Sequence, residues 1–327
     1  MPFWKRIRHY LETASCRLLA WWIPHLSRKS CIHFANGIGT VAYLLDRRGR
    51  GVALANLECA LGPDLTATQR REIAQASYRN FARTMVDLFW APALARPENR
   101  HWLRATDWRP LRERLEREKR GAVIISLHFG HWEWGSLAAA WNGFPSMAVA
   151  ENFKNPGLNA LFKSLREVSG QTIIPQEKSM LRLLRHVKRG GSMAFLGDLT
   201  VPPIQASAAV RTFALEMCVS VLHGVLALRG DALVIPSLCL PEPDGGARLM
   251  AFEPLDIPPG ATPATIAQLC WDHYEPIIRG NPALWLWSYK HFRYKPHATT
   301  TQYPPYANEW DAFDLLRTNV QVPGDGD

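Results

Sequence analysis

Residues 121–135, GAVIISLHFGHWEWG, carry the pattern that decides the fold. The first part, residues 122–127, is a short apolar run rich in β-branched residues, which indicates a buried strand. Gly130 allows the chain to turn, and a helix is predicted over residues 132–142. His128 follows the strand directly, so we expect it at the carboxyl end of a sheet, where open α/β sheets bind their ligands.

The rest of the C-terminal two thirds alternates between strand and helix patterns. Strands are predicted over residues 147–150, 172–174, 193–196, 232–240 and 247–254, and helices over 157–169, 178–189, 216–229 and 263–279. This alternation predicts the α/β fold class, with a mostly parallel central sheet covered by helices on both faces. Upstream, a helix capped by Thr68 is predicted over residues 66–90.

The N-terminal segment predicts helices that associate with a membrane. Apolar residues recur there at spacings of three and four, as on one helix face: Trp4, Ile7, Leu11, Ala14, Leu18 and Trp21. Basic residues fall largely elsewhere, which suits a helix lying in the plane of an anionic bilayer; docking on the protein's own core is the alternative. The following uncharged run, residues 30–45, is shorter than the about 20 residues of a spanning helix, so we favour a monotopic segment over a span.

Charge is concentrated in the same part of the chain. Residues 1–120 hold 22 Lys and Arg against 11 Asp and Glu, a net charge of +11, whereas the whole chain carries +9. This excess predicts an anionic partner, either a membrane surface or an acidic carrier protein. We do not expect a nucleic acid as the partner, because no nucleic-acid-binding module is recognisable. We also expect no metal site, since neither a Cys pair nor an H-E-x-x-H motif occurs.

His128 and Glu133 are the candidate catalytic pair. If Glu133 lies in the first turn of the predicted helix, its carboxylate can accept a hydrogen bond from one imidazole nitrogen. That bond would fix the tautomer and leave the other nitrogen free as a general base. Backbone N–H groups near Gly130, or Arg166, are the expected donors to a developing oxyanion. A core histidine, or a metal hydrolase using His131, is the alternative at this point.

The ordered motifs resemble a known family. His128-x4-Glu133 after a buried strand is similar to the H-x4-D/E acyltransferases, and the surrounding sequence resembles the lipid A biosynthesis late acyltransferases of the lauroyl/myristoyl type. The further matching motifs are Asn56-Leu57, Asn155-Pro156 followed by Arg166 and Gly170, Gly197-Asp198, and Trp285-Leu286-Trp287 through Arg293. The chain departs from the family pattern at Leu199, at Phe213-Ala214-Leu215 and at Tyr289, positions that concern acceptor handling rather than the His-Glu pair.

The resemblance implies specific roles for residues. His128 and Glu133 would be catalytic, and the substrate would be bound by Gly130, Asn155, Arg166 and Asp198. It divides the chain into a membrane-associating segment (1–50), an α/β acyltransferase domain (51–295) and a C-terminal tail (296–327).

The resemblance also implies a reaction and a location. The donor would be acyl carrier protein carrying a fatty acyl thioester, and no cofactor is needed. The acceptor would be a hydroxyl, or less readily an amine, of a membrane lipid of the lipid A type. The enzyme would sit peripherally on the cytoplasmic face of the bacterial inner membrane. Two other functions fit the same residues: acyl-thioester hydrolysis, and lipid binding without catalysis.

Overall fold

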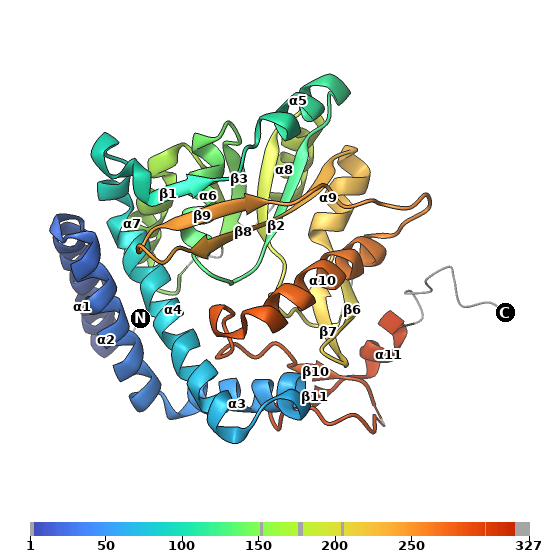
Figure 1. The fold of residues 1–327 in the computed structure, drawn as a ribbon. Helices are drawn as coiled ribbons and strands as arrows, with labels where there is room; N and C mark the ends of the chain where they lie inside the picture. Colours follow the sequence, from blue (N-terminus) through green and yellow to red (C-terminus); the bar gives the residue numbers. More distant parts are fainter. Residues whose placement is uncertain (1–2, 151–152, 176–178, 204–205, 298, 318–327) are drawn as a thin grey trace.

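The centre of the fold is a seven-stranded sheet in the order β1-β9-β8-β2-β5-β3-β4 (Figure 1). This computed structural model describes residues 3–317, apart from 151–152, 176–178, 204–205 and 298. Neighbouring strands are parallel except for β8 and β9, which are antiparallel. The strands are β1 (Leu103–Ala105), β2 (Ala122–Ser126), β3 (Ser146–Ala150), β4 (Thr172–Pro175), β5 (Ser192–Leu196), β8 (Leu233–Pro241) and β9 (Ala247–Ala251).

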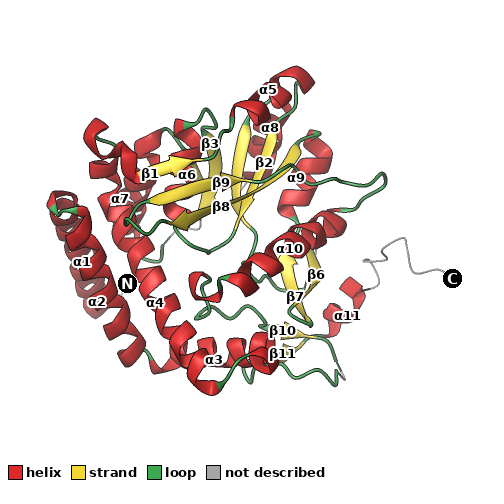
Figure 2. Ribbon diagram, in the orientation of Figure 1, coloured by secondary structure: helices red, strands yellow, loops and turns green. Residues whose placement is uncertain are grey.

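Helices cover both faces of this sheet, so the predicted fold class is confirmed (Figure 2). Successive side chains of β2 point to opposite faces, as the period of a strand requires. Ile124 joins the core formed with α4, α6 and α7, whereas Ile125 joins the core formed with α8, α9 and α10. The bounds are α4 (Ala67–Leu94), α5 (Arg109–Glu118), α6 (Trp132–Trp141), α7 (Pro156–Arg166), α8 (Ser179–Lys188), α9 (Leu222–Gly230) and α10 (Pro263–Gly280).

Three helices precede α4: α1 (Phe3–Trp22), α2 (Arg28–Leu45) and α3 (Arg47–Leu61). Helix α1 buries none of its residues, whereas α2 packs closely along α4. In the part of the chain that the structure describes, no helix is both long enough and apolar enough to cross a bilayer. The predicted cap of α4 is wrong by two residues, because Thr66 rather than Thr68 forms a capping box, with Gln69.

The helix predicted over residues 216–229 is wrong in its first part. Residues Leu215–Ser220 form strand β7, which pairs with β6 (Ser207–Thr212) in an antiparallel hairpin. Phe213 and Ala214 form its turn with φ of 53° and 58°. Two positive φ angles define a type I′ turn, for which Asn-Gly is the usual signal. Here tertiary contacts impose the turn, because the buried Phe213 ring stacks on Trp285 at 5.6 Å.

The described part of the predicted C-terminal tail is folded onto the hairpin. Strand β10 (Tyr294–Lys295) pairs with β11 (Asn308–Glu309), and α11 (Asp311–Arg317) follows. Phe313 of α11 is fully buried beside Ala209 and Cys218. Short 3-10 helices complete the chain at Ile23–His25, Gly62–Asp64, Pro97–Trp102, Glu167–Ser169 and Pro282–Leu284.

Candidate active site

The turn between β2 and α6 is held from two sides. The N–H of Gly130 donates to the carbonyl of Leu284 at 2.9 Å, and the N–H of His131 donates to the carbonyl of Cys239 at 2.7 Å. Gly130 has φ of +61°, and a Cβ at this position would clash with the carbonyl oxygen of Cys239. Only glycine tolerates both the positive φ and the lack of room for a Cβ. Because its N–H is already bonded, Gly130 itself offers no free backbone donor, while oxyanion donors near it and its role in substrate binding stay predictions.

A buried carboxylate, Asp198, orients His128. His128 Nδ1 lies 2.8 Å from Asp198 Oδ1, and the His128 backbone N–H donates to Oδ2 at 2.9 Å. The indole N–H of Trp285 donates to the same Oδ2 at 2.9 Å. Asp198 follows β5, the neighbour of β2, so the two parallel strands deliver both side chains to one edge of the sheet. Its 0% exposure leaves it no surface for the substrate-binding role predicted for it.

The predicted hydrogen bond between Glu133 and His128 is wrong. Glu133 instead accepts from Arg166 in a two-pronged ion pair, with Nε to Oε2 at 3.0 Å and Nη2 to Oε1 at 2.6 Å. Glu133 is the second residue of α6, which places it above the sheet rather than at the end of β2. Arg166, predicted as a substrate-binding residue, comes from the end of α7 and shares this position.

Opposing effects set the protonation of His128. Burial lowers the pKa of its ring, but the charge and hydrogen bond of Asp198 and the charge of Glu133 outweigh burial, so the pKa lies above its usual value. For Asp198, burial raises the pKa, but His128 outweighs that effect and holds the pKa at about 2. Asp198 is therefore ionised at neutral pH, which favours the tautomer of His128 with the proton on Nδ1. His128 Nε2 is then the basic nitrogen.

A second buried carboxylate supports the same turn from behind. Asp87 of α4 lies 3.0 Å from His131 Nδ1 and pairs with Arg28 of α2. The Arg28 guanidinium stacks on Trp134 of α6, 4.6 Å from the ring centroid. Burial lowers the pKa of His131, which is fully enclosed. His131 and His128 thus bind different carboxylates and do not form the metal-ligand pair considered from the sequence.

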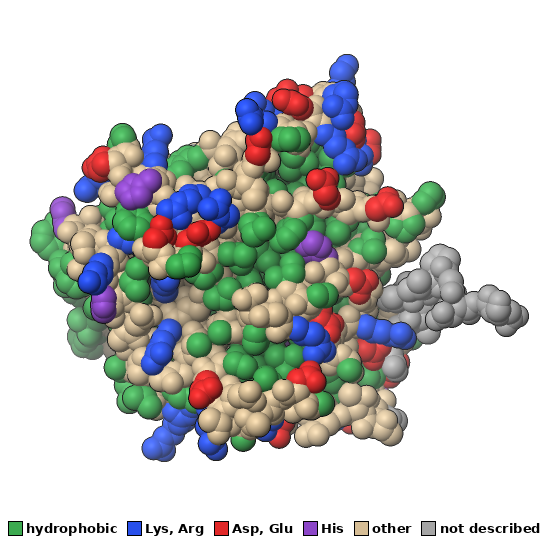
Figure 3. Space-filling model, in the orientation of Figure 1, with side chains coloured by type: hydrophobic (Ala, Val, Ile, Leu, Met, Phe, Trp, Pro, Cys, Tyr) green, Lys and Arg blue, Asp and Glu red, His purple; other side chains and the backbone are tan. Residues whose placement is uncertain are grey.

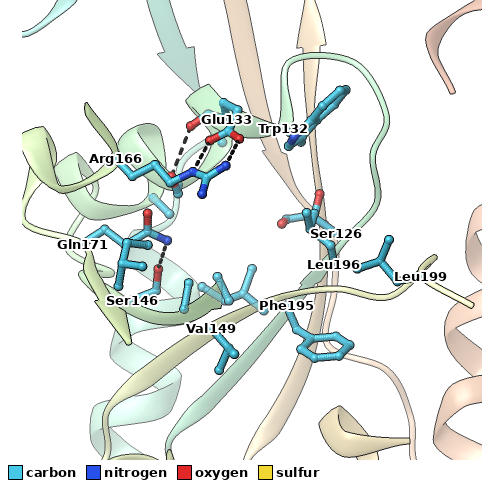
Figure 4. A pocket seen from close by; sticks show the side chains of 18 of the residues that line it. Ser126, Trp132, Glu133, Ser146, Val149, Arg166, Gln171, Phe195, Leu196 and Leu199 are labelled. Carbon is cyan, nitrogen blue, oxygen red and sulfur yellow. Dashed lines mark hydrogen bonds and ion pairs between the residues drawn. The ribbon is translucent and has the colours of Figure 1, made fainter. Parts of the chain in front are cut away.

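A largely apolar cavity of about 420 Å³ lies on the α6 side of the sheet. Its floor consists of alternate residues of three adjacent strands, with the small side chains of Ala148 and Ala194 at the centre. Figure 4 shows Ser126, Leu196 and Leu199 on one side of the cavity, with Ser146 and Gln171 on the opposite side. The register of β2, β5 and β3 places Ser126 and Ser146 near opposite ends of the strands. The two levels are four residues apart along β5, a distance of about 13 Å.

The cavity begins beside the turn that carries His128. His128 is not one of its lining residues, but its ring packs edge-on against Trp132, which is, with centroids 5.3 Å apart. Glu133 and Arg166 line the cavity near this end (Figure 4). Among the described residues, Arg166 Nη1 has no hydrogen-bond partner, so this N–H donor remains available to a ligand. The imidazole of His128, the guanidinium of Arg166 and an apolar cavity therefore lie next to one another.

Asn155 is not among the residues that line the cavity, and its role in substrate binding stays a prediction. Its side chain caps α7 by accepting from the N–H of Gly157 at 3.1 Å. Its amide also donates to the His9 carbonyl and to Glu12, at 2.9 and 3.0 Å. Asn155 therefore fastens α1 to α7.

Two site residues were not predicted from the sequence. Trp285 lies in a motif noted for its family likeness, but nothing in that motif shows that its indole reaches Asp198. Asp87 lies in the C-terminal half of α4 among buried apolar neighbours, but nothing in that stretch of sequence shows which groups its carboxylate meets.

Comparisons with known proteins agree with this geometry. The model of a family described as bacterial lipid A biosynthesis acyltransferase matches residues 3–294, a range that contains every site residue above. A search of curated proteins found no match.

We predict that Asp198→Asn lowers the pKa of His128 more than Glu133→Gln does, because Asp198 is the direct partner. NMR titration of the His128 ring measures both shifts. Asp231→Asn, which changes an exposed carboxylate, is the control and should have no effect. A larger fall in Glu133→Gln, or no fall in Asp198→Asn, would show that Asp198 does not hold the ring.

Proposed function

Because the chain belongs to the bacterial lipid A biosynthesis acyltransferase family, and so is an acyltransferase for lipid A-type acceptors, we propose that it moves a fatty acyl chain from acyl carrier protein to a hydroxyl group of a membrane lipid. The observation that carries this proposal is His128, oriented by Asp198 and packed against Trp132, which lines an apolar cavity.

The proton transfers follow from the tautomer of His128. Nε2 takes the proton of the acceptor hydroxyl as its oxygen attacks the thioester carbonyl carbon, and Asp198 stabilises the imidazolium that forms. When the tetrahedral intermediate collapses, the carbon–sulfur bond breaks and the imidazolium returns the proton to the leaving thiolate. The products are an ester and a free thiol. No cofactor or covalent enzyme intermediate is required.

Arg166 is the donor best placed to stabilise the developing oxyanion. Its Nη1 is unpaired within the described structure, while Glu133 holds the other side of the guanidinium in a fixed orientation. A charged donor fixed beforehand in a partly buried site stabilises negative charge better than water does, because it need not reorganise. Glu133 thus becomes a positioning residue for Arg166 rather than for His128.

The cavity supports a fatty acyl group as the transferred chain. Its lining is mostly aliphatic and aromatic, and it extends from Ser126 and Leu196, near His128, to Ser146 at the other end of the strands. A lipid-binding protein without catalysis would have no need of a buried Asp198 that keeps a base in one tautomer. Thioester hydrolysis uses the same residues with water as the acceptor, so the products must separate the two reactions.

The N-terminal helices support a location at the membrane surface. Helix α1 exposes Trp4, Leu11 and Leu18, which are 58%, 57% and 61% accessible. Figure 3 shows hydrophobic side chains along the edge that α1 forms, interspersed with basic ones. Such a surface suits peripheral attachment to anionic lipid on the cytoplasmic face of the inner membrane.

His128→Ala should lower acyl transfer by about 100-fold or more, the usual contribution of a general base. The assay follows labelled acyl carrier protein into acyl lipid and into free fatty acid. Acyl lipid as the main wild-type product supports transfer, whereas free fatty acid alone indicates a hydrolase. Full activity in folded His128→Ala contradicts the mechanism.

Ala194→Leu should shift the donor preference toward shorter acyl chains, because the larger side chain fills the centre of the cavity floor. Competition between acyl carrier proteins loaded with different chain lengths measures this preference. Butyryl carrier protein is the internal control, since a chain that short ends before Ala194. An unchanged preference would place the acyl chain elsewhere.

Leu18→Glu should release protein from anionic vesicles, because it places a charge on the exposed face of α1. Co-sedimentation measures the bound fraction, and high salt should reduce that fraction for the wild type as well. Leu181→Glu, at a similarly exposed leucine of α8 (65% against 61%), is the matched control. Release by Leu181→Glu alone would assign the membrane surface to α8.

A further inference from the structure

A second cavity, of about 260 Å³, lies between α3 and the chain that follows Tyr289. Arg48 and Gly51 of α3 line one side, and Lys290 and Tyr306 line the other. Figure 1 shows α3 beside β10 and β11, the segments that bring these two parts of the chain together. The mechanism above makes no use of this cavity.

The cavity has a rigid wall that connects it to the catalytic site. The Asn56 amide donates to the carbonyls of Trp287 and Tyr289, both at 2.8 Å, and its oxygen accepts from the Tyr306 hydroxyl. On the other side of Lys290, His291 Nδ1 lies 3.3 Å from the Asp198 carbonyl oxygen. The backbone that carries Lys290 is therefore fixed by α3 and by the residue that orients His128.

Among the residues that line the cavity, two are cationic and none is acidic, although Asp46 lies close enough to Arg48 for that charge to help lower the pKa of Asp46. Throughout the described residues, neither Arg48 nor Lys290 has a carboxylate within ion-pair distance, and the Lys290 ammonium lies over the Tyr306 ring at 5.0 Å. The nearest acid in sequence, Asp46, already accepts from the Tyr78 hydroxyl and the Gly49 N–H. Two cations with hydrogen-bond donors facing one small space match a phosphate group.

The position of the cavity indicates the source of that phosphate. The last turns of α2 expose Val41, Leu44 and Leu45, which are 52%, 60% and 75% accessible, and Arg47 and Arg48 follow after the cap residue Asp46. Figure 3 shows basic side chains projecting at the bottom of the view, where α2 meets α3 in Figure 1. An apolar surface bordered by cations is the order found at a bilayer interface, where lipid phosphates lie.

We infer that Arg48 and Lys290 bind the phosphate of a phosphorylated lipid acceptor, and so hold its headgroup while the hydroxyl reaches His128. This inference rests on the proposed transfer to a membrane lipid and names the acceptor's recognition group. It assigns to the acceptor a site separate from the acyl cavity.

Binding in the absence of donor tests the site independently of catalysis. The probes are water-soluble dihexanoyl phosphatidic acid, dihexanoylglycerol and inorganic phosphate, measured by calorimetry on the full chain. Arg48→Ala and Lys290→Ala should each weaken phosphatidic acid binding by about tenfold or more, the effect of losing one charge-assisted hydrogen bond. Dihexanoylglycerol binding should stay the same. Arg71→Ala, on the exposed side of α4, is the charge control and should match the wild type.

Gly51→Leu tests the cavity by filling it. A Cβ at Gly51 meets no atom within 4 Å, so the larger side chain enters the cavity without disturbing the fold. Gly280→Leu is the steric control, because Gly280 has equally open surroundings at the end of α10. Gly51→Leu should lose phosphatidic acid binding and Gly280→Leu should keep it.

Each remaining outcome has a distinct meaning. Wild-type binding that survives Arg48→Ala, Lys290→Ala and Gly51→Leu, or no wild-type binding, overturns the inference. Inorganic phosphate bound as tightly as phosphatidic acid identifies a free-phosphate site and overturns the lipid assignment. Transfer assays run alongside test the proposed function by itself: a chain that binds phosphatidic acid as expected but makes no acyl lipid keeps this site and loses the proposed reaction.

Discussion

The Asp198 carboxylate, buried and bonded to three N–H groups, is the interaction on which the site depends. It accepts from the His128 ring, the His128 backbone and the Trp285 indole, and so joins the ends of β2 and β5 to the C-terminal loop. Three donors compensate the loss of hydration that a buried charge suffers. If this carboxylate were neutral, the ring would lose its preferred tautomer and the turn would lose one of its attachments.

The division of work between two acidic residues follows from this arrangement. Asp198 sets the protonation of His128, while Glu133, which the spacing H-x4-E makes the obvious partner, binds Arg166 instead. Behind the turn, Asp87 lies beside the His131 ring and pairs with Arg28, but there burial prevails and the pKa of His131 is lowered. Both carboxylates are thus matched by cations or N–H donors, while within the described part of the chain His128 Nε2 and Arg166 Nη1 have no hydrogen-bond partner.

Sequence patterns predicted the fold better than they predicted the pairing of side chains. The parallel sheet could be predicted because buried strands such as residues 122–126 are continuous apolar runs separated by helical periods. His128 and Arg166 could be chosen as site candidates because they occur in motifs whose order along the chain resembles that of a known family. The partner of His128 could not, since His128 and Asp198 are 70 residues apart and meet only when β2 pairs with β5. The β6–β7 hairpin was missed because Phe213-Ala214 carries none of the usual turn residues.

The pH dependence of kcat/KM for acyl transfer tests the central claim most directly, namely that His128 is the base and Asp198 keeps it so. The base acts only when neutral, so the rate should rise with pH through the raised pKa of His128. In Asp198→Asn that rise should move to lower pH, because the negative charge that favours the protonated ring is gone. The plateau should also fall, since the imidazolium formed in the reaction loses its counter-charge. The account would be contradicted if kcat/KM of Asp198→Asn rose over the same pH range as that of the wild type and reached the same plateau.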